Sequence, residues 1–294
     1  MKPDEAIGKR VKEAPMPADA SVQLVTQCFL AACELDVTAL KPGNVRIGVA
    51  VRGMSADDFL SSARASAPAL ARHGARVGER LLEAIRFTQR IVHCNTNLGI
   101  VLLAGPLFHA AEAGLPLREA LAQTLAQLDL SDCRFAYEAI RLARPGGLGT
   151  SPHHDVAVEP QVTLLEAMRE AQGRDSIARQ YVQGYRDIFD FGFPLWERAL
   201  ARFGEETWAA TYLFLAYLST WRDSLIERKF DAATAQAVSD RAREFDSHWS
   251  SGLETMQVRL LSWDGELRHA GINPGTSADL TAATVFAAKL ARAV

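Results

Sequence analysis

Apolar residues recur three and four positions apart along almost the whole of this 294-residue chain. The segments that carry this spacing are long and rich in Ala, Leu, Arg and Glu, and they show little of the β-branched alternation typical of strands. Residues three and four apart share one face of a helix, so each segment can bury a stripe against its neighbours. The chain is therefore predicted to be all-α, a single compact multi-helix domain.

Helices are predicted over residues 19–38, 56–71, 75–93, 97–114, 116–128, 131–143, 161–171, 173–190, 192–202, 205–221, 231–250, 252–263 and 277–292. No linker or internal repeat divides them. Residues 1–18 hold three prolines and little apolar periodicity, and they are predicted to form a flexible leader. Residues 19–294 are expected to form the helical domain.

Composition excludes several classes of protein. A chain with 48% hydrophobic residues and a net charge of -3 can bury a large core but lacks the basic stripe that a nucleic-acid partner requires. The longest apolar stretch, residues 98–113, contains Pro106 and is shorter than the roughly 20 apolar residues of a membrane span. The four cysteines form no Cys-x-x-Cys pair and follow no secretory signal, so a cytoplasmic protein with reduced thiols is expected.

Three polar junctions lie directly beside apolar helical runs, at Lys41–Val45, Asn95–Gly99 and Asn273–Leu280. Polar groups at such places either cap helices or face a pocket, and three junctions exceed what capping requires. At the first junction Lys41 follows Glu34 and Asp36, a combination that is compatible with a phosphate or Mg²⁺ site. The alternative is a helix C-terminus that Pro and Gly simply end.

The second junction precedes the most apolar helical run of the chain. Asn95 or Thr96 can cap that helix and leave its N–H groups aimed at an anion. One cap does not need a second asparagine, so Asn97 is a further candidate for ligand binding. A buried amide bonded to the backbone is the structural alternative for Asn97.

Residues 144–159 form the one long irregular stretch between helices, and loops of this length inside a domain are usually functional. Glycines at 146, 147 and 149 precede His153, His154 and Asp155. Neither a Walker loop nor a dinucleotide-binding glycine pattern is present. Adjacent histidines in an extended loop point in different directions, so Asp155 is preferred as the functional residue of this loop.

Two further segments carry charges at helical spacing. Asp223 can hold a metal while Arg228 meets phosphate, although a surface charge ladder explains the same spacing. Residues 276–279 are interpreted as a capping box at the start of the last helix, with Asp279 as its reciprocal acid.

Together these segments resemble the triphosphoribosyl-dephospho-coenzyme A synthases, in particular the divergent branch found in archaea and C1-metabolising bacteria. The resemblance covers nearly the whole chain. It rests on Lys41–Val45, Gly53–Met54, Asp57–Phe59, Asn95–Gly99, Leu142–Gly149, His154–Val156, Arg174–Asp175, Ile177–Tyr181, Asp223–Ser224, Arg228–Lys229 and Asn273–Leu280.

The resemblance implies an all-α transferase that takes ATP as substrate, expels adenine and joins the triphosphoribosyl group to 3′-dephospho-coenzyme A. It places Lys41, Asn44, Asn95, Thr96, Asn97, Arg228, Lys229 and Ser277 around the nucleotide. Mg²⁺ is assigned to Asp223 with Glu34 or Asp36. Asp155 or Asp279 is then left as the carboxylate near C1, with Asp223 as a third catalytic candidate.

One departure keeps other functions open. The better-known branch carries His-Lys where this chain has Asn97 and Leu98, and losing a cation beside a triphosphate changes how phosphate is held. A related ribosyl transfer to another acceptor, such as a tetrahydromethanopterin precursor, is therefore an alternative. A nucleotide-binding helical protein without catalysis is a second alternative, and a homodimer is conceivable for either.

Overall fold

The computed structural model describes residues 18–51 and 53–293, and their regular structure is helical. Within these residues no β-strand forms, and only two isolated bridges occur, between Arg46 and Val49 and between Val51 and Met54. The prediction of an all-α protein is confirmed. Of the predicted leader 1–18, residues 1–17 lie outside the described residues, and Ala18 begins the first helix.

The described helices are, in chain order, α1 (Ala18–Thr38), α2 (Ala56–Leu70), α3 (Val77–Val92), α4 (Leu98–Ala111), α5 (Leu117–Ala126), α6 (Leu130–Ala143), α7 (Leu164–Ala171), α8 (Ser176–Val182), the π-helix η1 (Asp187–Gly192), α9 (Phe193–Phe203), α10 (Glu206–Thr220), α11 (Ser224–Lys229), α12 (Ala232–Glu244), the 3₁₀ helix η2 (Phe245–Ser251), α13 (Leu253–His269) and α14 (Gly275–Ala293).

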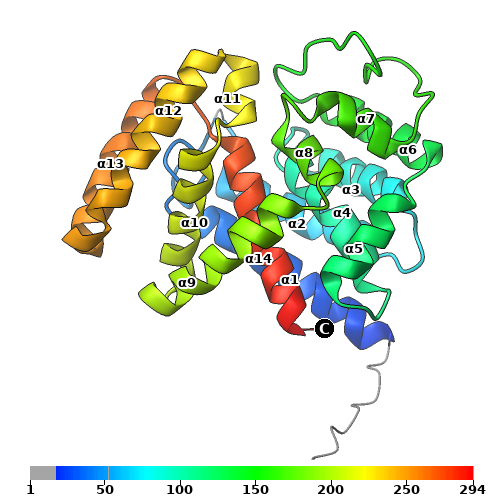
Figure 1. Ribbon diagram of the computed structural model, residues 1–294, viewed down its shortest axis with the longest axis horizontal. Coiled ribbons are helices and arrows are strands. Elements are labelled where there is room, and N and C mark those ends of the chain that lie inside the picture. The colour runs from blue at the N-terminus through cyan, green and yellow to red at the C-terminus, as the bar shows by residue number, and fades with distance from the viewer. Residues whose placement is uncertain (1–17, 52, 294) are drawn as a thin grey trace, which may run out of the picture.

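Helix α14 lies in the middle of the molecule, between α9–α13 on one side and α2–α8 on the other (Figure 1). Its residues are small and apolar on nearly every face, so it can pack against α1, α4 and α10 at once. Phe29 of α1, Phe108 of α4 and Phe286 of α14 meet in the core, with ring centroids 5.1 to 5.7 Å apart. The apolar run at 98–113 is thus a buried helix, as predicted.

In the described part of the chain, no helix combines the length and the apolar character that crossing a membrane requires.

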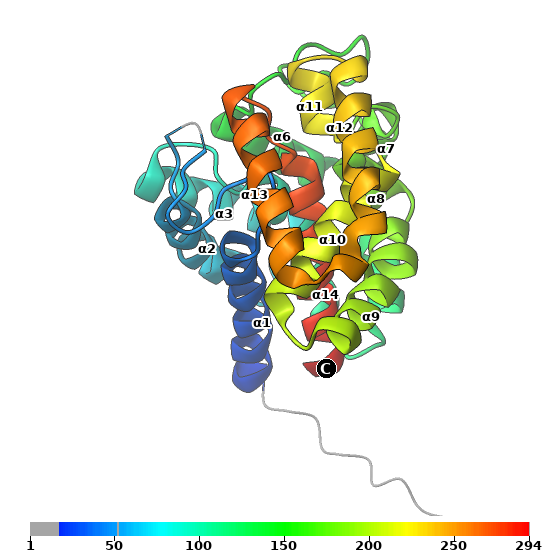
Figure 2. The same ribbon diagram turned by 90° about the vertical axis from the view of Figure 1, so that its left-hand side faces the viewer.

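Helices α12 and α13 form the outer side of the group α9–α13, and Figure 2 shows them facing the viewer. A second apolar cluster joins them to α10, with Phe245 and Trp263 stacked at a centroid distance of 5.1 Å. The inward edge of α13 carries the buried Asp264, which reaches the segment after α1. The group α9–α13 therefore supports one wall of the site described below.

Four features differ from the predicted helices. Helix α11 was not predicted, and α13 continues to His269 instead of ending at residue 263. The range 173–190 is interrupted, because Gly184 and Tyr185 both have positive φ angles, which an α-helix cannot contain. The chain resumes as the π-helix η1, and the Tyr185 hydroxyl donates to the Leu103 carbonyl 3.0 Å away. The range 231–250 ends as an α-helix at Glu244 and continues as the 3₁₀ helix η2.

Candidate active site

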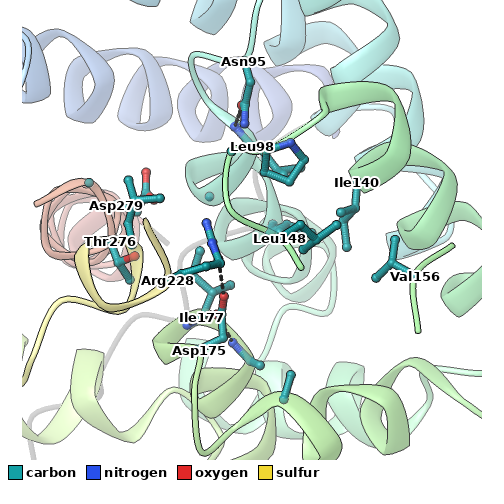
Figure 3. A pocket seen from close by; sticks show the side chains of 18 of the residues that line it. Asn95, Leu98, Ile140, Leu148, Val156, Asp175, Ile177, Arg228, Thr276 and Asp279 are labelled. Atoms are coloured by element: carbon teal, nitrogen blue, oxygen red, sulfur yellow. Dashed lines mark hydrogen bonds and ion pairs between the residues drawn. The ribbon is translucent and has the colours of Figure 1, made fainter. Parts of the chain in front are cut away.

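A cavity of about 480 Å³ lies where the N-termini of α4, α8 and α14 converge (Figure 3). Its walls also include Asp36 of α1, Met54, Phe59 of α2, the turn after α1, helices α6, α7 and α11, and the loop 144–163. The three polar junctions singled out in the sequence all contribute residues to it. Helix N-termini carry the positive ends of the helix dipoles, so this convergence suits an anionic ligand.

A buried lysine underlies one wall of the cavity. Lys41 is fully buried and forms an ion pair with Asp36, and its Nζ also donates to Asn44 Oδ1 at 2.9 Å. Asn44 Nδ2 in turn donates to Asn273 Oδ1 at 2.8 Å. Asp36, Asn44 and Asn273 line the cavity, whereas Lys41 lies behind them. The chain thus presents these polar groups with their own hydrogen bonds already made.

The turn that carries Asn44 is held by α13. Asp264 accepts a hydrogen bond from the Gly43 N–H at 2.8 Å and pairs with Arg268 at 2.9 Å. Gly43 has a φ of +78°, and a Cβ there would lie 2.8 Å from the Ile272 carbonyl oxygen. Only glycine meets both conditions, which is why the turn that follows Lys41 contains one.

Asp279 faces the cavity from the first turns of α14 and has no hydrogen-bond or ion-pair partner among the described residues. Removal from water raises the pKa of its carboxyl well above the usual value, and the negative charges of Asp36 and Asp223 add to this rise. Lys41 opposes the shift. Asp279 is therefore a carboxyl group that binds its proton tightly in a polar cavity.

Helix α4 approaches this carboxyl group at Gly99. A Cβ at that position would lie 2.0 Å from Asp279 Oδ2, closer than any two such atoms can be. Asn95 caps the same helix, since its Oδ1 accepts from the Leu98 N–H at 3.2 Å. Glycine in the first turn of α4 thus lets Asp279 lie against the helix N-terminus.

The opposite side of the polar region carries basic side chains next to the carboxylates of Glu170, Asp175 and Glu227. Arg228 and Lys229 of α11 line the cavity with Arg174, and Arg228 pairs with Asp175 at 3.1 Å, as Figure 3 shows. The Nε of Arg228 is buried and has no partner among the described residues. The segment 144–159, called the glycine-rich loop below, packs on this helix. A Cβ at Gly147 would lie 3.1 Å from the Arg228 carbonyl oxygen.

Asp155 lines the cavity but is engaged within its own loop. Its carboxylate accepts from the Ser151 N–H at 2.5 Å and from the Ala157 N–H at 2.7 Å. These hydrogen bonds lower its pKa, so the group is ionised and shapes the turn of the loop. Asp155 therefore lies at the site, but its oxygens accept hydrogen bonds from the backbone of its own loop.

Asp223 is buried beneath the site and does not line the cavity. It caps α11 through the N–H groups of Leu225 and Ile226, and it accepts from both the N–H and the hydroxyl of Ser277, at 2.7 and 2.8 Å. The predicted capping box at 276–279 is wrong, because α14 begins at Gly275 and Asp223 takes the place of a local cap. Burial still raises the Asp223 pKa.

The remaining predicted residues divide between the cavity wall and its support. Thr96 lines the cavity and bonds to Ser62, at 2.5 Å. Asn97 lies behind the wall and contacts Thr88 and Ser66 through its side chain. Glu34 is exposed and lines no part of the cavity.

A family model described as ATP:dephospho-CoA triphosphoribosyl transferase matches residues 22–294. The chain belongs to this family. A crystal structure of a candidate triphosphoribosyl-dephospho-coA synthase from Archaeoglobus fulgidus is 27% identical, with a TM-score of 0.62 over 78% of this chain and 97% of that chain. Among curated proteins none matches. The resemblance drawn from the sequence is confirmed, and the chain is a transferase of the triphosphoribosyl-dephospho-CoA synthase class.

The predicted metal ligands of this triphosphoribosyl transferase are not brought together. The carboxylate oxygens of Asp223 accept four hydrogen bonds. Glu34 is exposed to solvent, and Asp36 is paired with Lys41. Residues 18–51 and 53–293 contain no group of three or more His, Cys, Asp or Glu arranged to hold a metal ion. These side chains do not fit a resident metal.

Several wall residues of the transferase received no role from the sequence. Arg174 donates to the Ser151 hydroxyl at 2.8 Å and so joins α8 to the glycine-rich loop, and Asp175 both caps α8 and pairs with Arg228. Both belong to a motif that carries the family resemblance. Glu227 and Tyr137 also line the cavity, and no local signal distinguishes them from ordinary helix residues.

Proposed function

We propose that the protein transfers the triphosphoribosyl group of ATP to a hydroxyl group of 3′-dephospho-coenzyme A and releases adenine. Membership in the family supports the reaction class. The observation that carries the proposal is Asp279, an unpartnered carboxyl group with a raised pKa beside a helix N-terminus. Arg174, Arg228 and Lys229 of the same cavity are groups that can pair with phosphate oxygens.

The phosphates are assigned to Arg228, Lys229 and Arg174, together with the positive dipole end of α4. The buried, unpartnered Nε of Arg228 is a donor that a phosphate oxygen would satisfy. Lys41 adds positive charge from behind the wall, since its Nζ is occupied by Asp36 and Asn44. Asn44, Asn95 and Thr96 offer polar groups to the nucleotide from the cavity surface.

The reaction breaks the bond from C1 to the adenine nitrogen and forms a bond from C1 to the acceptor oxygen. The hydroxyl group loses a proton and the departing adenine gains one. A carboxyl group whose pKa is raised by burial holds a proton that it can donate to adenine, and Asp279 has this property. Asp155 is ionised and engaged with the loop, so it is the weaker candidate.

Mg²⁺ enters the proposal as the ion that ATP carries, with phosphate oxygens and waters as its main ligands. Such an ion neutralises charge on the triphosphate. Asp36 is the one predicted metal ligand that lines the cavity.

Adenine release from ATP, measured by liquid chromatography, tests the proposal. It is run with 3′-dephospho-coenzyme A, with a ribitol-bearing pterin precursor and without acceptor. Release that depends on 3′-dephospho-coenzyme A is the expected result, and Asp279→Asn protein prepared in parallel controls for contaminating nucleosidase. Release only with the pterin would transfer the proposal to that acceptor. ATP-induced thermal stabilisation without any release would replace it with a nucleotide-binding role.

Gly99→Ala is expected to abolish adenine release and to lower the melting temperature. The new methyl group would occupy space held by the Asp279 carboxyl group, so either the helix or the carboxyl group must move. Gly265→Ala in α13 is the matched control, because a Cβ there meets nothing within 4 Å. The control should gain about 0.5–1 kcal/mol of helix stability and keep full activity. An active Gly99→Ala protein would show that the contact with α4 is unimportant.

A further inference from the structure

The cavity has a second, apolar side that the phosphates and Asp279 do not use. It is formed by Ile140, Leu148, Val156, Leu164, Ala167 and Met168. Figure 3 shows Ile140, Leu148 and Val156 on the side away from Asp279 and Thr276, with Arg228 between the two groups. None of these six side chains carries a charge, so this side suits an uncharged part of a ligand.

The glycine-rich loop gives the same side a row of unpaired amides. Residues 146 and 147 form a turn, and the other N–H and C=O groups from residue 146 to residue 150 have no hydrogen-bond partner among the described residues. These five residues are exposed, and 146, 148, 149 and 150 line the cavity. Gly149 leaves the backbone accessible to a ligand at short range, because a Cβ there would meet nothing within 4 Å. An extended chain that itself contains amides could pair with such a backbone.

The position of the reaction leaves this side to the acceptor. Adenine is attached to C1 and must lie near Asp279 when it leaves, and the triphosphate requires the cations of α11. We infer that the apolar wall and the 146–150 backbone bind the uncharged, amide-bearing arm of the acceptor, and that Leu148 contributes to acceptor specificity. This inference rests on the proposed function and adds the group by which 3′-dephospho-coenzyme A is distinguished from a plain nucleotide.

The six residues of the apolar side are aliphatic or thioether side chains, which match the methyl groups of a flexible arm.

ADP is the probe that isolates the arm, because it is 3′-dephospho-coenzyme A without the arm. Equilibrium binding of both compounds is measured by titration calorimetry, alongside adenine release with each as acceptor. The wild-type protein is expected to bind 3′-dephospho-coenzyme A at least about tenfold more tightly than ADP. Equal affinity for the two compounds would overturn the inference.

Leu148→Asp tests the wall itself. Leu148 is 43% exposed, so the variant should fold, and a carboxylate beside the arm should raise the KM for 3′-dephospho-coenzyme A about tenfold while the KM for ATP changes little. Leu142→Asp is the matched control, since Leu142 is 36% exposed on the outer face of α6 and lines no part of this cavity. The control should behave as the wild type. Equal losses for ATP and acceptor in Leu148→Asp would contradict the inference.

The two hypotheses fail separately. Tighter binding of 3′-dephospho-coenzyme A than of ADP, lost in Leu148→Asp, supports the arm site even when no adenine is released. Adenine release that ADP supports as well as 3′-dephospho-coenzyme A would keep the transfer reaction and overturn the arm site.

Discussion

Replacing Asp279 by asparagine is expected to reduce adenine release by about 10³-fold and, at neutral pH, to stabilise the protein. Asparagine keeps the size of the side chain but cannot donate the proton that adenine needs. In the wild type, kcat/KM should fall as the pH rises through the Asp279 pKa, because the acid form is then lost. The residual activity of the variant should lack this limb of the pH profile.

The stability effect follows from the direction of the pKa shift. The folded-state pKa of Asp279 is raised above its unfolded value of about 3.9, so the folded protein binds this proton more tightly. That contribution to stability is fully present below the unfolded pKa and is lost as the pH rises through the folded pKa. Asp279→Asn should therefore have the higher melting temperature near neutral pH, with the difference disappearing in acid.

Asp223→Asn is the matched control for this experiment. Burial raises the pKa of Asp223 as well, but its oxygens accept four hydrogen bonds, two from α11 and two from Ser277. An asparagine there would turn an N–H group toward a donor, which should cost about 1–3 kcal/mol of stability. An Asp279→Asn protein that keeps activity within about tenfold of the wild type would refute proton donation by Asp279.

Lys41→Met is expected to cost about 3–5 kcal/mol of unfolding free energy, because it leaves the buried Asp36 without its cation. The positive charge of Lys41 also opposes the rise in the Asp279 pKa, so its loss should raise that pKa further. Chemical denaturation measures the stability, and the pH profile of adenine release measures the second effect.

The matched control is Lys289→Met, which removes a lysine from an exposed pair with Glu206. Surface pairs contribute roughly 0–1 kcal/mol, so this variant should unfold near the wild type. A second variant, Lys41→Met with Asp36→Asn, should recover much of the lost stability, since no unpaired charge remains. A Lys41→Met protein as stable as the Lys289→Met protein would show that the buried pair contributes little.

Features that depend on neighbouring residues were predictable. The run at 98–111 is apolar on every face, and such a helix must lie in the interior whatever packs around it. Pro42 cannot continue a helix, so α1 must end before it. Asn95 caps α4 by accepting a hydrogen bond from the N–H three residues later. The three polar junctions, which were expected to cap helices or face a pocket, all contribute residues to one cavity.

Features that depend on distant residues were not. The cap of α14 comes from Asp223, 54 residues earlier in the chain, so a local capping box at 276–279 was a reasonable but wrong interpretation. The same contact removes Asp223 from the cavity. The interruption at Gly184 and Tyr185 is likewise accompanied by a tertiary contact, from Tyr185 to Leu103 of α4.

By itself the sequence determined the helical class, the order of the helices and the three junctions, because helix periodicity, capping and turn chemistry act over a few residues. Only the tertiary structure decided which carboxyl group faces the cavity without a partner. Asp155, Asp223 and Asp279 are equivalent as sequence, yet the first is bonded to its loop, the second is buried under a helix end and the third is left to the ligand. Burial and long-range hydrogen bonds set their proton affinities, and these depend on segments that meet only when the chain folds.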